Sequence, residues 1–266
     1  MARHRGRFNR QNPAPYELSR SRVENYLKCK ACFWLEQLHR VKPPEIPSFT
    51  INTTTDILLK RDADAVRGRQ TLPLWAAHGL DHLIPFEHEH LEKWTNSLHY
   101  GANDTYFNTV HTESNIKFGG GLDDVFLNTR TGQIHIVDYK STAQGTRSPI
   151  KYEKKPVSLN DPWKISYKRQ MDMYVWVMRR KGFSISSIGY FLYCDGDRFS
   201  EYNFLNSENA SMQFKMSLIP YRVDTGWIEP TLLSIKECLY YPETPRHAEN
   251  CEYGKFLRAL QFDDRN

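Results

Sequence analysis

The sequence predicts an α/β fold in which a mixed central β-sheet is flanked by helices. Two strand-like stretches joined by a turn occupy residues 117–141, and a helix pattern begins at Asp161-Pro162. Further strand patterns occupy residues 185–194 and 214–221. Helices and strands that follow one another in this order favour one sheet with helices packed on its faces.

The composition fits one α/β domain. The chain has 266 residues, of which 39% are hydrophobic and 13% aromatic, enough apolar side chains to build a core. A mean hydropathy of −0.65 and the lack of any apolar run approaching about twenty residues exclude a transmembrane helix. The formal charge of +5 favours a polyanionic partner.

The basic amino-terminal segment, residues 1–16, is predicted to be a flexible arm. It contains no acidic residue, two prolines, and the arginines Arg3, Arg5, Arg7 and Arg10. Such an arm either touches phosphate groups or is an inert solvated tail. No apolar segment follows the basic residues, so we do not expect a secretory signal. Five cysteines without such a signal predict a reducing, cytoplasmic location.

Three further helices are predicted outside the central strands. Residues 19–40 have roughly helical apolar spacing, and the pair Pro43-Pro44 ends them. Residues 51–70 begin with threonines that offer N-caps and carry a modest apolar face, and residues 226–241 form a closing helix. We expect residues 17–266 to form a single domain.

Two carboxylates and a lysine come together on the stretch 117–141. Asp123 on the first strand and Asp138 on the second lie fifteen positions apart, and the turn brings both to one end of the hairpin. Lys140 lies two residues after Asp138, so its side chain points to the same side. Neighbouring carboxylates repel each other unless a cation neutralises them, and Mg²⁺ prefers carboxylate oxygens. The alternative is a solvated strand end at which an Asp pairs with a Lys.

Three short motifs follow one another along the chain. They are Gly120-Gly121-Leu122-Asp123, then Asp138-Tyr139-Lys140-Ser141, then Gln170-Met171-Asp172-Met173-Tyr174 on the following helix. Their residues and order resemble those of the RecB-like branch of the PD-(D/E)XK nucleases. The resemblance extends from about Leu18 to Leu260 and is to stand-alone members of that branch. It implies a restriction-endonuclease-like core.

The resemblance also implies a nuclease that hydrolyses DNA phosphodiester bonds with Mg²⁺ or Mn²⁺. The implied metal ligands are Asp56, Asp123, Asp138 and the carbonyl of Tyr139. Lys140 would position the attacking water or stabilise charge on the phosphate. Gln170 and Tyr174 would shape the pocket.

Asp56 lies where the family carries a histidine ligand, on the helix before the hairpin. Asp62 and Asp64 are rivals for the same role, because one or two turns of helix change the face that a residue occupies. An aspartate in a first helical turn also serves as a partner of the helix dipole. The sequence therefore leaves the third metal ligand open.

Four of the five cysteines form a candidate second metal site. Cys29 and Cys32 form a C-x-x-C motif, and Cys238 and Cys251 lie near the other end of the chain. In some relatives, one amino-terminal and three carboxy-terminal cysteines hold an iron–sulfur cluster. This chain departs from that pattern, because Gly254 stands where those relatives have the last cysteine. Three interpretations follow: a zinc site, a cluster, or ordinary reduced thiols.

Basic residues beside the motifs are candidate nucleic-acid contacts. Lys151, Lys154 and Lys155 lie in a polar loop that borders the nucleic-acid path of the family. Lys168 and Arg169 come just before the third motif. Such residues would contact phosphates rather than bases. The alternative is a plain solvated loop.

The resemblance implies DNA as the partner, delivered by a helicase or by other repair or defence proteins, and no membrane. One competing hypothesis is a nucleic-acid-binding subunit of a repair or defence complex that keeps the fold without cutting. Another is a sugar or small-phosphate enzyme on a different fold. A nuclease would need a divalent metal and lose cutting on Asp138→Ala, whereas a binder would keep its affinity.

Overall fold

The structure is a computed structural model that describes residues 3–44, 50–143 and 156–263. The chain forms two compact units. Unit 1 comprises Met1–Pro47, Glu92–Gly121 and Thr225–Asn266, and unit 2 comprises Ser48–Leu91 and Leu122–Asp224. The single domain expected for residues 17–266 stays a prediction.

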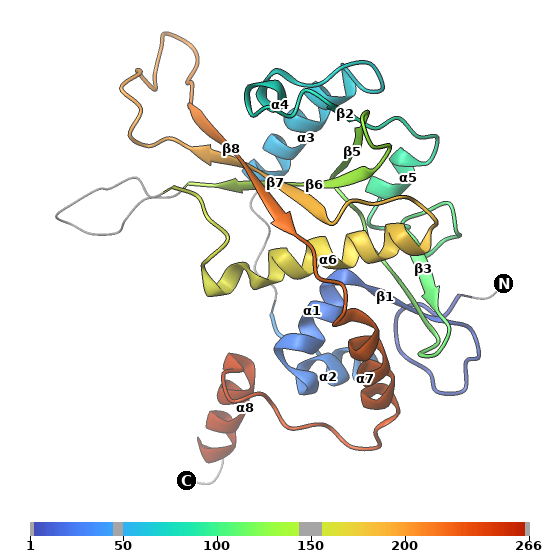
Figure 1. The fold of residues 1–266 in the computed structure, drawn as a ribbon. Coiled ribbons are helices and arrows are strands. Elements are labelled where there is room, and N and C mark those ends of the chain that lie inside the picture. The colour runs from blue at the N-terminus through green and yellow to red at the C-terminus, as the bar shows by residue number, and fades with distance from the viewer. Residues whose placement is uncertain (1–2, 45–49, 144–155, 264–266) are drawn as a thin grey trace. The chain divides into compact units, whose positions relative to one another are not determined.

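Unit 2 is built on a five-stranded mixed sheet in the order β2-β5-β6-β7-β8 (Figure 1). The strands are β2 (Leu83–Pro85), β5 (Asp124–Asn128), β6 (Ile134–Thr142), β7 (Ile188–Gly196) and β8 (Phe214–Arg222). Strands β6 and β7 are parallel, and the other three pairs are antiparallel. The predicted mixed sheet is confirmed, and its last two predicted strands correspond to β7 and β8.

The predicted hairpin is formed by β5 and β6, with Asp124 opposite Val137. Its turn is held by Asn128, whose side-chain Oδ1 accepts a hydrogen bond of 3.0 Å from the backbone N–H of Arg130. Gly132 has φ +72°, a left-handed conformation that glycine adopts without steric cost. This turn chemistry fixes the register of the two strands that carry the candidate site.

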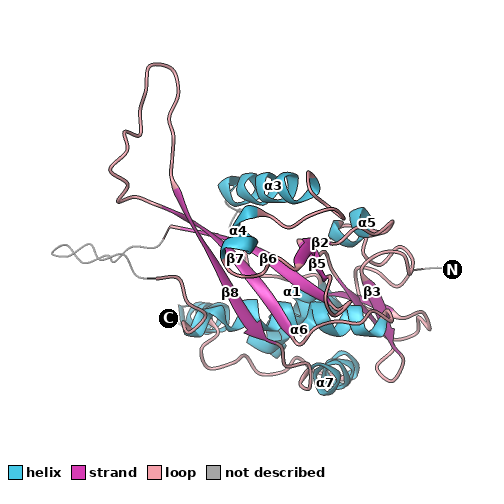
Figure 2. Ribbon diagram, turned by 45° about the horizontal axis from the view of Figure 1, so that its top comes forward, coloured by secondary structure: helices cyan, strands magenta, loops and turns pink. Residues whose placement is uncertain are grey.

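Helices cover both faces of this sheet. They are α3 (Thr50–Asp64), α4 (Pro73–Ala77), the short 3₁₀ helix η1 (Pro162–Lys164) and α6 (Ile165–Arg180). Figure 2 shows the sheet between α3 and α4 on one side and α6 on the other. The connection from β6 to β7 contains η1 and α6, since parallel neighbours need a crossover. Every residue of α6 from Gln170 to Met178 is buried.

The apolar core of unit 2 is centred on Trp75 of α4. Its indole is fully buried and stacks on Phe126 with ring centroids 4.4 Å apart. The buried residues packed in this cluster with these two are Leu83, Val137, Tyr139, Tyr190 and Leu192. Val137 and Tyr139 are two residues apart in β6, so the odd-numbered side chains of β6 face this core.

Unit 1 combines a small sheet with helices from both ends of the chain. Its sheet has the order β1-β4-β3, with β1 (Tyr16–Ser19) parallel to β4 (Ile116–Gly119) and β3 (Asn108–His111) antiparallel to β4. The helices are α1 (Arg20–Lys28), α2 (Lys30–His39), α7 (Ile228–Tyr240) and α8 (Glu252–Asp263), and α5 (Leu91–Thr95) spans a boundary between the units in the sequence. No helix among the described residues is long and apolar enough to cross a lipid bilayer.

The helix predicted over residues 19–40 is divided into two. Cys29 separates α1 from α2 with extended backbone angles, φ −160° and ψ 110°. Apolar spacing continues across the break, because both helices pack on the same interior of unit 1. The hydroxyl of Tyr26 is 2.7 Å from the Ser234 Oγ of α7, and the Trp34 indole N–H donates a 3.3 Å hydrogen bond to the carbonyl of Tyr241.

The segment expected to be a flexible arm is packed within unit 1 over its described part, residues 3–16. Arg3 forms a two-pronged ion pair with the buried Glu17, with both N–O distances 2.6 Å. His4 and Phe8 are buried and stack on each other. The two buried rings anchor the segment, although the many arginines around them in the sequence suggest a solvated arm.

Candidate active site

Asp138 is the centre of the candidate site. It lies in the middle of β6 with no exposed surface. Because side chains alternate along a strand, Asp138 and Lys140 point to the face opposite Tyr139. On that face, the side-chain amide of Gln170 in α6 donates a 2.6 Å hydrogen bond to Asp138 Oδ1. The buried carboxylate of Asp138 therefore accepts a hydrogen bond from α6, the helix that covers this face of the sheet.

Lys140 supplies the positive charge beside Asp138. Its Nζ forms an ion pair with Asp138 Oδ2 and donates a 3.2 Å hydrogen bond to the carbonyl of Tyr139. The ammonium group also lies 5.0 Å from the centroid of the Tyr167 ring. Burial lowers the pKa of Lys140, but the charges of Asp138 and Asp123 outweigh it and raise the pKa above its ordinary value. Lys140 is therefore a cation at neutral pH.

Asp123 is the second carboxylate of the site and comes directly before β5. Its Oδ2 accepts a 2.9 Å hydrogen bond from the backbone N–H of Tyr139. Burial raises the pKa of the Asp123 carboxyl to about 8, and the negative charge of Asp138 adds to the shift. The hairpin thus brings Asp138 close enough to Asp123 for its charge to raise the pKa of the Asp123 carboxyl.

Gln170 and Tyr174 lie one helical turn apart on the buried face of α6. Gln170 Nε2, which donates to Asp138, is also 3.2 Å from the hydroxyl oxygen of Tyr174. The structure therefore joins the third motif to the second through one side-chain amide. Gln170 of the predicted stripe is directed at the sheet through its hydrogen bond to Asp138.

Asp56 is the aspartate of α3 whose pKa is affected by the charged residues of the site. α3 is tied to β6 by a hydrogen bond between the hydroxyls of Thr55 and Ser141. Burial raises the pKa of Asp56 to about 6, while Lys140 lowers it and Asp138 raises it. The rivals are both exposed: Asp62 pairs with Arg61, and Asp64 pairs with Lys60 and Arg67. The role of Asp56 as a metal ligand stays a prediction.

A buried network on the opposite face was missed by sequence reasoning. Asp124 has no exposed surface, and its two carboxylate oxygens each accept a 3.0 Å hydrogen bond from Arg67. The Tyr139 hydroxyl donates a further 2.8 Å hydrogen bond to Asp124 Oδ2. Tyr139 therefore links two adjacent carboxylates, since its N–H holds Asp123 and its hydroxyl holds Asp124. The Asp123-Asp124 pair was the available signal, because neighbours in a strand face opposite sides.

The sequence matches the family profile of the PD-(D/E)XK nuclease superfamily over residues 17–201, which is more than half of the chain. The chain belongs to the PD-(D/E)XK nuclease superfamily. No curated protein matches the sequence. The RecB-like branch within the superfamily stays a prediction.

The superfamily match includes the basic residues predicted to contact nucleic acid. Lys168 and Arg169 are half-buried in the first turns of α6, immediately before Gln170. Lys151, Lys154 and Lys155 lie outside the described residues. The nucleic-acid contacts of all five stay predictions.

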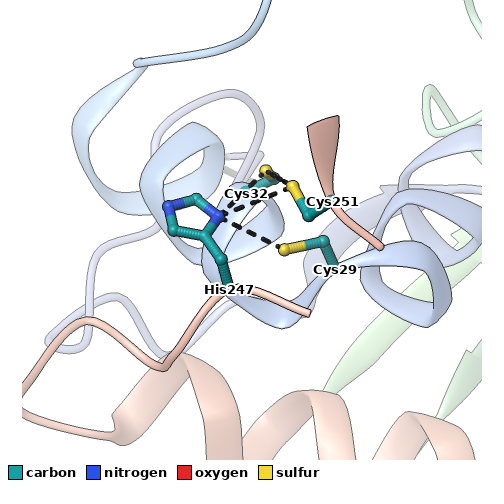
Figure 3. Close-up of side chains that lie close together, drawn as sticks. All are labelled: Cys29, Cys32, His247 and Cys251. Carbon is teal, nitrogen blue, oxygen red and sulfur yellow. Dashed lines mark hydrogen bonds between the residues drawn. The ribbon is translucent and has the colours of Figure 1, made fainter. Parts of the chain in front are cut away.

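The cysteines form a separate cluster, wholly within unit 1 (Figure 3). The Nδ1 atom of His247 lies 3.5 Å from Cys29 Sγ, 3.6 Å from Cys32 Sγ and 3.7 Å from Cys251 Sγ. Cys32 Sγ and Cys251 Sγ are 3.5 Å apart. Burial raises the pKa of the Cys29 thiol, but donors that include the backbone N–H groups of Cys32 and Ala248 outweigh it and lower the pKa to about 6.

Cys238, predicted to be the fourth ligand, is not part of this cluster. It is buried in α7, and burial raises the pKa of its thiol to about 11. His247, which lies between α7 and α8 in the sequence, instead joins Cys29, Cys32 and Cys251 (Figure 3). The His247-x-x-x-Cys251 spacing was the signal that sequence reasoning missed.

The two sites differ in how tightly their ligand atoms gather. Among the described residues, Cys29, Cys32, His247 and Cys251 are the one group of three or more Cys, His, Asp or Glu whose ligand atoms all lie within 4.8 Å of one another. The carboxylates of Asp56, Asp123 and Asp138 therefore do not converge to that extent.

Proposed function

We propose that the chain hydrolyses DNA phosphodiester bonds with Mg²⁺ or Mn²⁺ as cofactor. The observation that carries the proposal is Asp138, fully buried between the ammonium group of Lys140 and the amide of Gln170, in a chain of the PD-(D/E)XK nuclease superfamily. Burying a carboxylate is costly unless it is paired and hydrogen-bonded, and this one faces a covering helix rather than solvent.

The residues present fit a divalent cation. Asp123 and Asp138 offer hard oxygen donors, which Mg²⁺ and Mn²⁺ prefer. Burial raises the pKa of Asp123 to about 8, and the charge of Asp138 adds to the shift, so a cation beside the pair would favour the ionised carboxylate. Asp56 and the Tyr139 carbonyl are the further oxygens that would hold the ion. A bound cation would polarise the scissile phosphate and lower the pKa of a water molecule.

Each remaining residue has a defined task in this proposal. Lys140 is held protonated by its carboxylate neighbours, so it would stabilise the negative charge that develops on the phosphate oxygens. Gln170 fixes the orientation of Asp138 through Oδ1, and Tyr174 lies within hydrogen-bond distance of the same amide. The hydrogen bond from the Tyr139 N–H sets the orientation of Asp123.

A second candidate function is a DNA-binding subunit that keeps the fold without cutting. The observation in its favour is that the three aspartates do not gather as closely as the cysteine cluster does. Such a subunit would serve a complex in which a helicase or another repair or defence protein supplies the activity.

Cleavage of labelled single- and double-stranded DNA would separate the two functions. The wild type, Lys140→Ala and the exposed control Asp62→Asn would each be assayed with Mg²⁺, with Mn²⁺ and with a chelator. We expect metal-dependent cutting by the wild type and by the control, and a loss of roughly 100-fold or more in Lys140→Ala. If the wild type binds DNA in a salt-sensitive way but never cuts it, the stand-alone nuclease is overturned and the binding subunit is favoured.

A further inference from the structure

We propose that Cys29, Cys32, His247 and Cys251 bind one zinc ion, which joins the α1–α2 junction to the chain just before α8. The residues come from segments more than 200 positions apart, yet their ligand atoms all lie within 4.8 Å of one another. The site is independent of the carboxylates of unit 2 and has no role in the proposed hydrolysis.

The distances match a single tetrahedral ion. Zinc–sulfur bonds of about 2.3 Å and zinc–nitrogen bonds of about 2.0–2.1 Å place the ligand atoms of a tetrahedron roughly 3.6 Å apart for S–N pairs and about 3.8 Å apart for S–S pairs. The three S–N distances here are 3.5, 3.6 and 3.7 Å, and the Cys32–Cys251 S–S distance is 3.5 Å. Four of the six distances among the ligand atoms therefore lie close to those of a tetrahedral site, and all six are within 4.8 Å.

The same distances argue against a four-iron cluster. In that cluster each ligand binds a different iron atom, so the ligand atoms stand farther apart than around one ion. Three thiolates and one imidazole are a common ligand set of structural zinc. Because all four positions are taken by protein atoms, no position is left for a substrate.

The surroundings of the cluster fit bound thiolates. The backbone N–H of Ala248 lies 3.5 Å from Cys29 Sγ, and that of Gly254 lies 3.3 Å from Cys251 Sγ, so both donate to sulfur. A Cβ on Gly254 would come within 2.6 Å of the Cβ of His247. A glycine at this position of α8 therefore leaves the room that the imidazole occupies.

The ion would have a clear structural consequence for α8. Between Glu252 and Leu260, the one buried residue is Gly254, next to the cluster. Phe256 and Leu260 are 57% and 47% exposed, so apolar packing contributes little to holding the helix. The ligand Cys251, directly before α8, and the first turn of the helix thus attach α8 to the rest of unit 1.

The metal content of the full-length protein, purified without added metal, tests the proposal first. Mass spectrometry should find about one zinc per chain and no visible absorption of an iron–sulfur cluster. His247→Ala and Cys251→Ser should lose the zinc, whereas the matched control Cys238→Ser should keep it. Stoichiometric iron, or loss of zinc in the Cys238 control, would overturn the assignment.

Cobalt substitution keeps the test valid if the variants fail to fold. Wild-type protein stripped of metal and loaded with Co²⁺ should show the intense visible bands of tetrahedral cobalt and a thiolate charge-transfer band. A weak, octahedral-type spectrum would contradict the site. The readout does not depend on DNA cleavage, so it is independent of the outcome for the nuclease.

Limited proteolysis then tests what the ion does. Lys255 and Arg258 are exposed trypsin sites within α8. We expect several-fold faster cleavage at these sites after zinc removal, and reversal when zinc is restored. An unchanged cleavage rate in protein shown to be free of zinc would refute the attachment of α8 by the ion.

Discussion

The carboxylate site of unit 2 and the cysteine–histidine cluster of unit 1 use opposite strategies to bring charged ligands together. Asp138 is surrounded by groups of the protein itself, since Lys140 neutralises it and Gln170 donates to it. The cluster instead places three sulfurs around His247 Nδ1 with every such distance between 3.5 and 3.7 Å. No lysine or arginine is among its hydrogen-bond partners in the described residues.

The different surroundings of the two sites suit them to different tasks. A carboxylate pair partly neutralised by a lysine holds a cation loosely, so metal and phosphate can share the remaining ligand positions. A closed set of four soft ligands holds its ion firmly and leaves no position for substrate. The proposed functions follow this difference, with metal exchange and hydrolysis at the first site and attachment of the chain at the second.

The largest expected effect is the loss of cleavage in Asp138→Asn. The substitution keeps the shape of the side chain but removes the charge that faces Lys140 and the proposed metal ion. We expect the metal-dependent cleavage rate to fall by at least about 100-fold, while zinc content stays at the wild-type level. Rates measured with labelled DNA, together with metal analysis of the same samples, check both parts.

The exposed Asp62→Asn is the matched control for charge. It should cleave at the wild-type rate, because Asp62 pairs with Arg61 at the surface of α3. Should Asp138→Asn also lose zinc, the independence of the two sites would be wrong.

The next largest effect is on folding stability, through the network behind the carboxylates. Asp124→Ala leaves Arg67 without its buried partner and the Tyr139 hydroxyl without its acceptor. We expect a loss of roughly 3–5 kcal/mol in the free energy of unfolding, measured by urea denaturation. The exposed Asp64→Ala should cost less than about 1 kcal/mol. Equal losses in both variants would show that Asp124 is not a support of the site.

Much of the carboxylate site could be predicted because it is built from local patterns. The turn residues fix the hairpin, and the period of two places Asp138 and Lys140 on one face. The spacing of Gln170 and Tyr174 marks one stripe of α6. What the sequence could not provide was the role of Asp124, since that depends on Arg67, more than fifty residues earlier in the chain.

The cysteine cluster shows where such reasoning fails. Its fourth member depends on the path of residues 241–251, which contain no regular helix or strand and so no period to follow. In the sequence, Cys238 and Cys251 are equivalent candidates. In the structure, the side chain of Cys238 is buried in α7, away from the cluster. The break at Cys29 was also hidden, because apolar spacing continues from α1 into α2.

Gly254→Ala sharpens the comparison with a smaller change. The added methyl group would meet His247 and displace the imidazole, while the helix propensity of α8 would improve. We expect zinc affinity to fall by about 10–100-fold, as for other residues that support metal ligands, with DNA cleavage unchanged. Competition with a chromophoric chelator measures the affinity, and the exposed Arg258→Ala is the control. Wild-type affinity in Gly254→Ala would mean that the glycine is not needed by the site.

The smallest effect is a pH dependence of unit 2 that involves neither site. His135 of β6 is buried, and its Nδ1 is 2.9 Å from the carbonyl oxygen of Ile188. Burial lowers the pKa of His135 below its ordinary value of 6.5. The unfolded chain therefore binds a proton at a pH where the folded chain does not, so stability falls as the pH drops below 6.5, by at most about 1.4 kcal/mol per pH unit.

Urea midpoints at several pH values should show a shallower fall in His135→Gln than in the exposed control His78→Gln. If the urea midpoints of the two variants change equally with pH, His135 does not contribute to the acid sensitivity of unit 2.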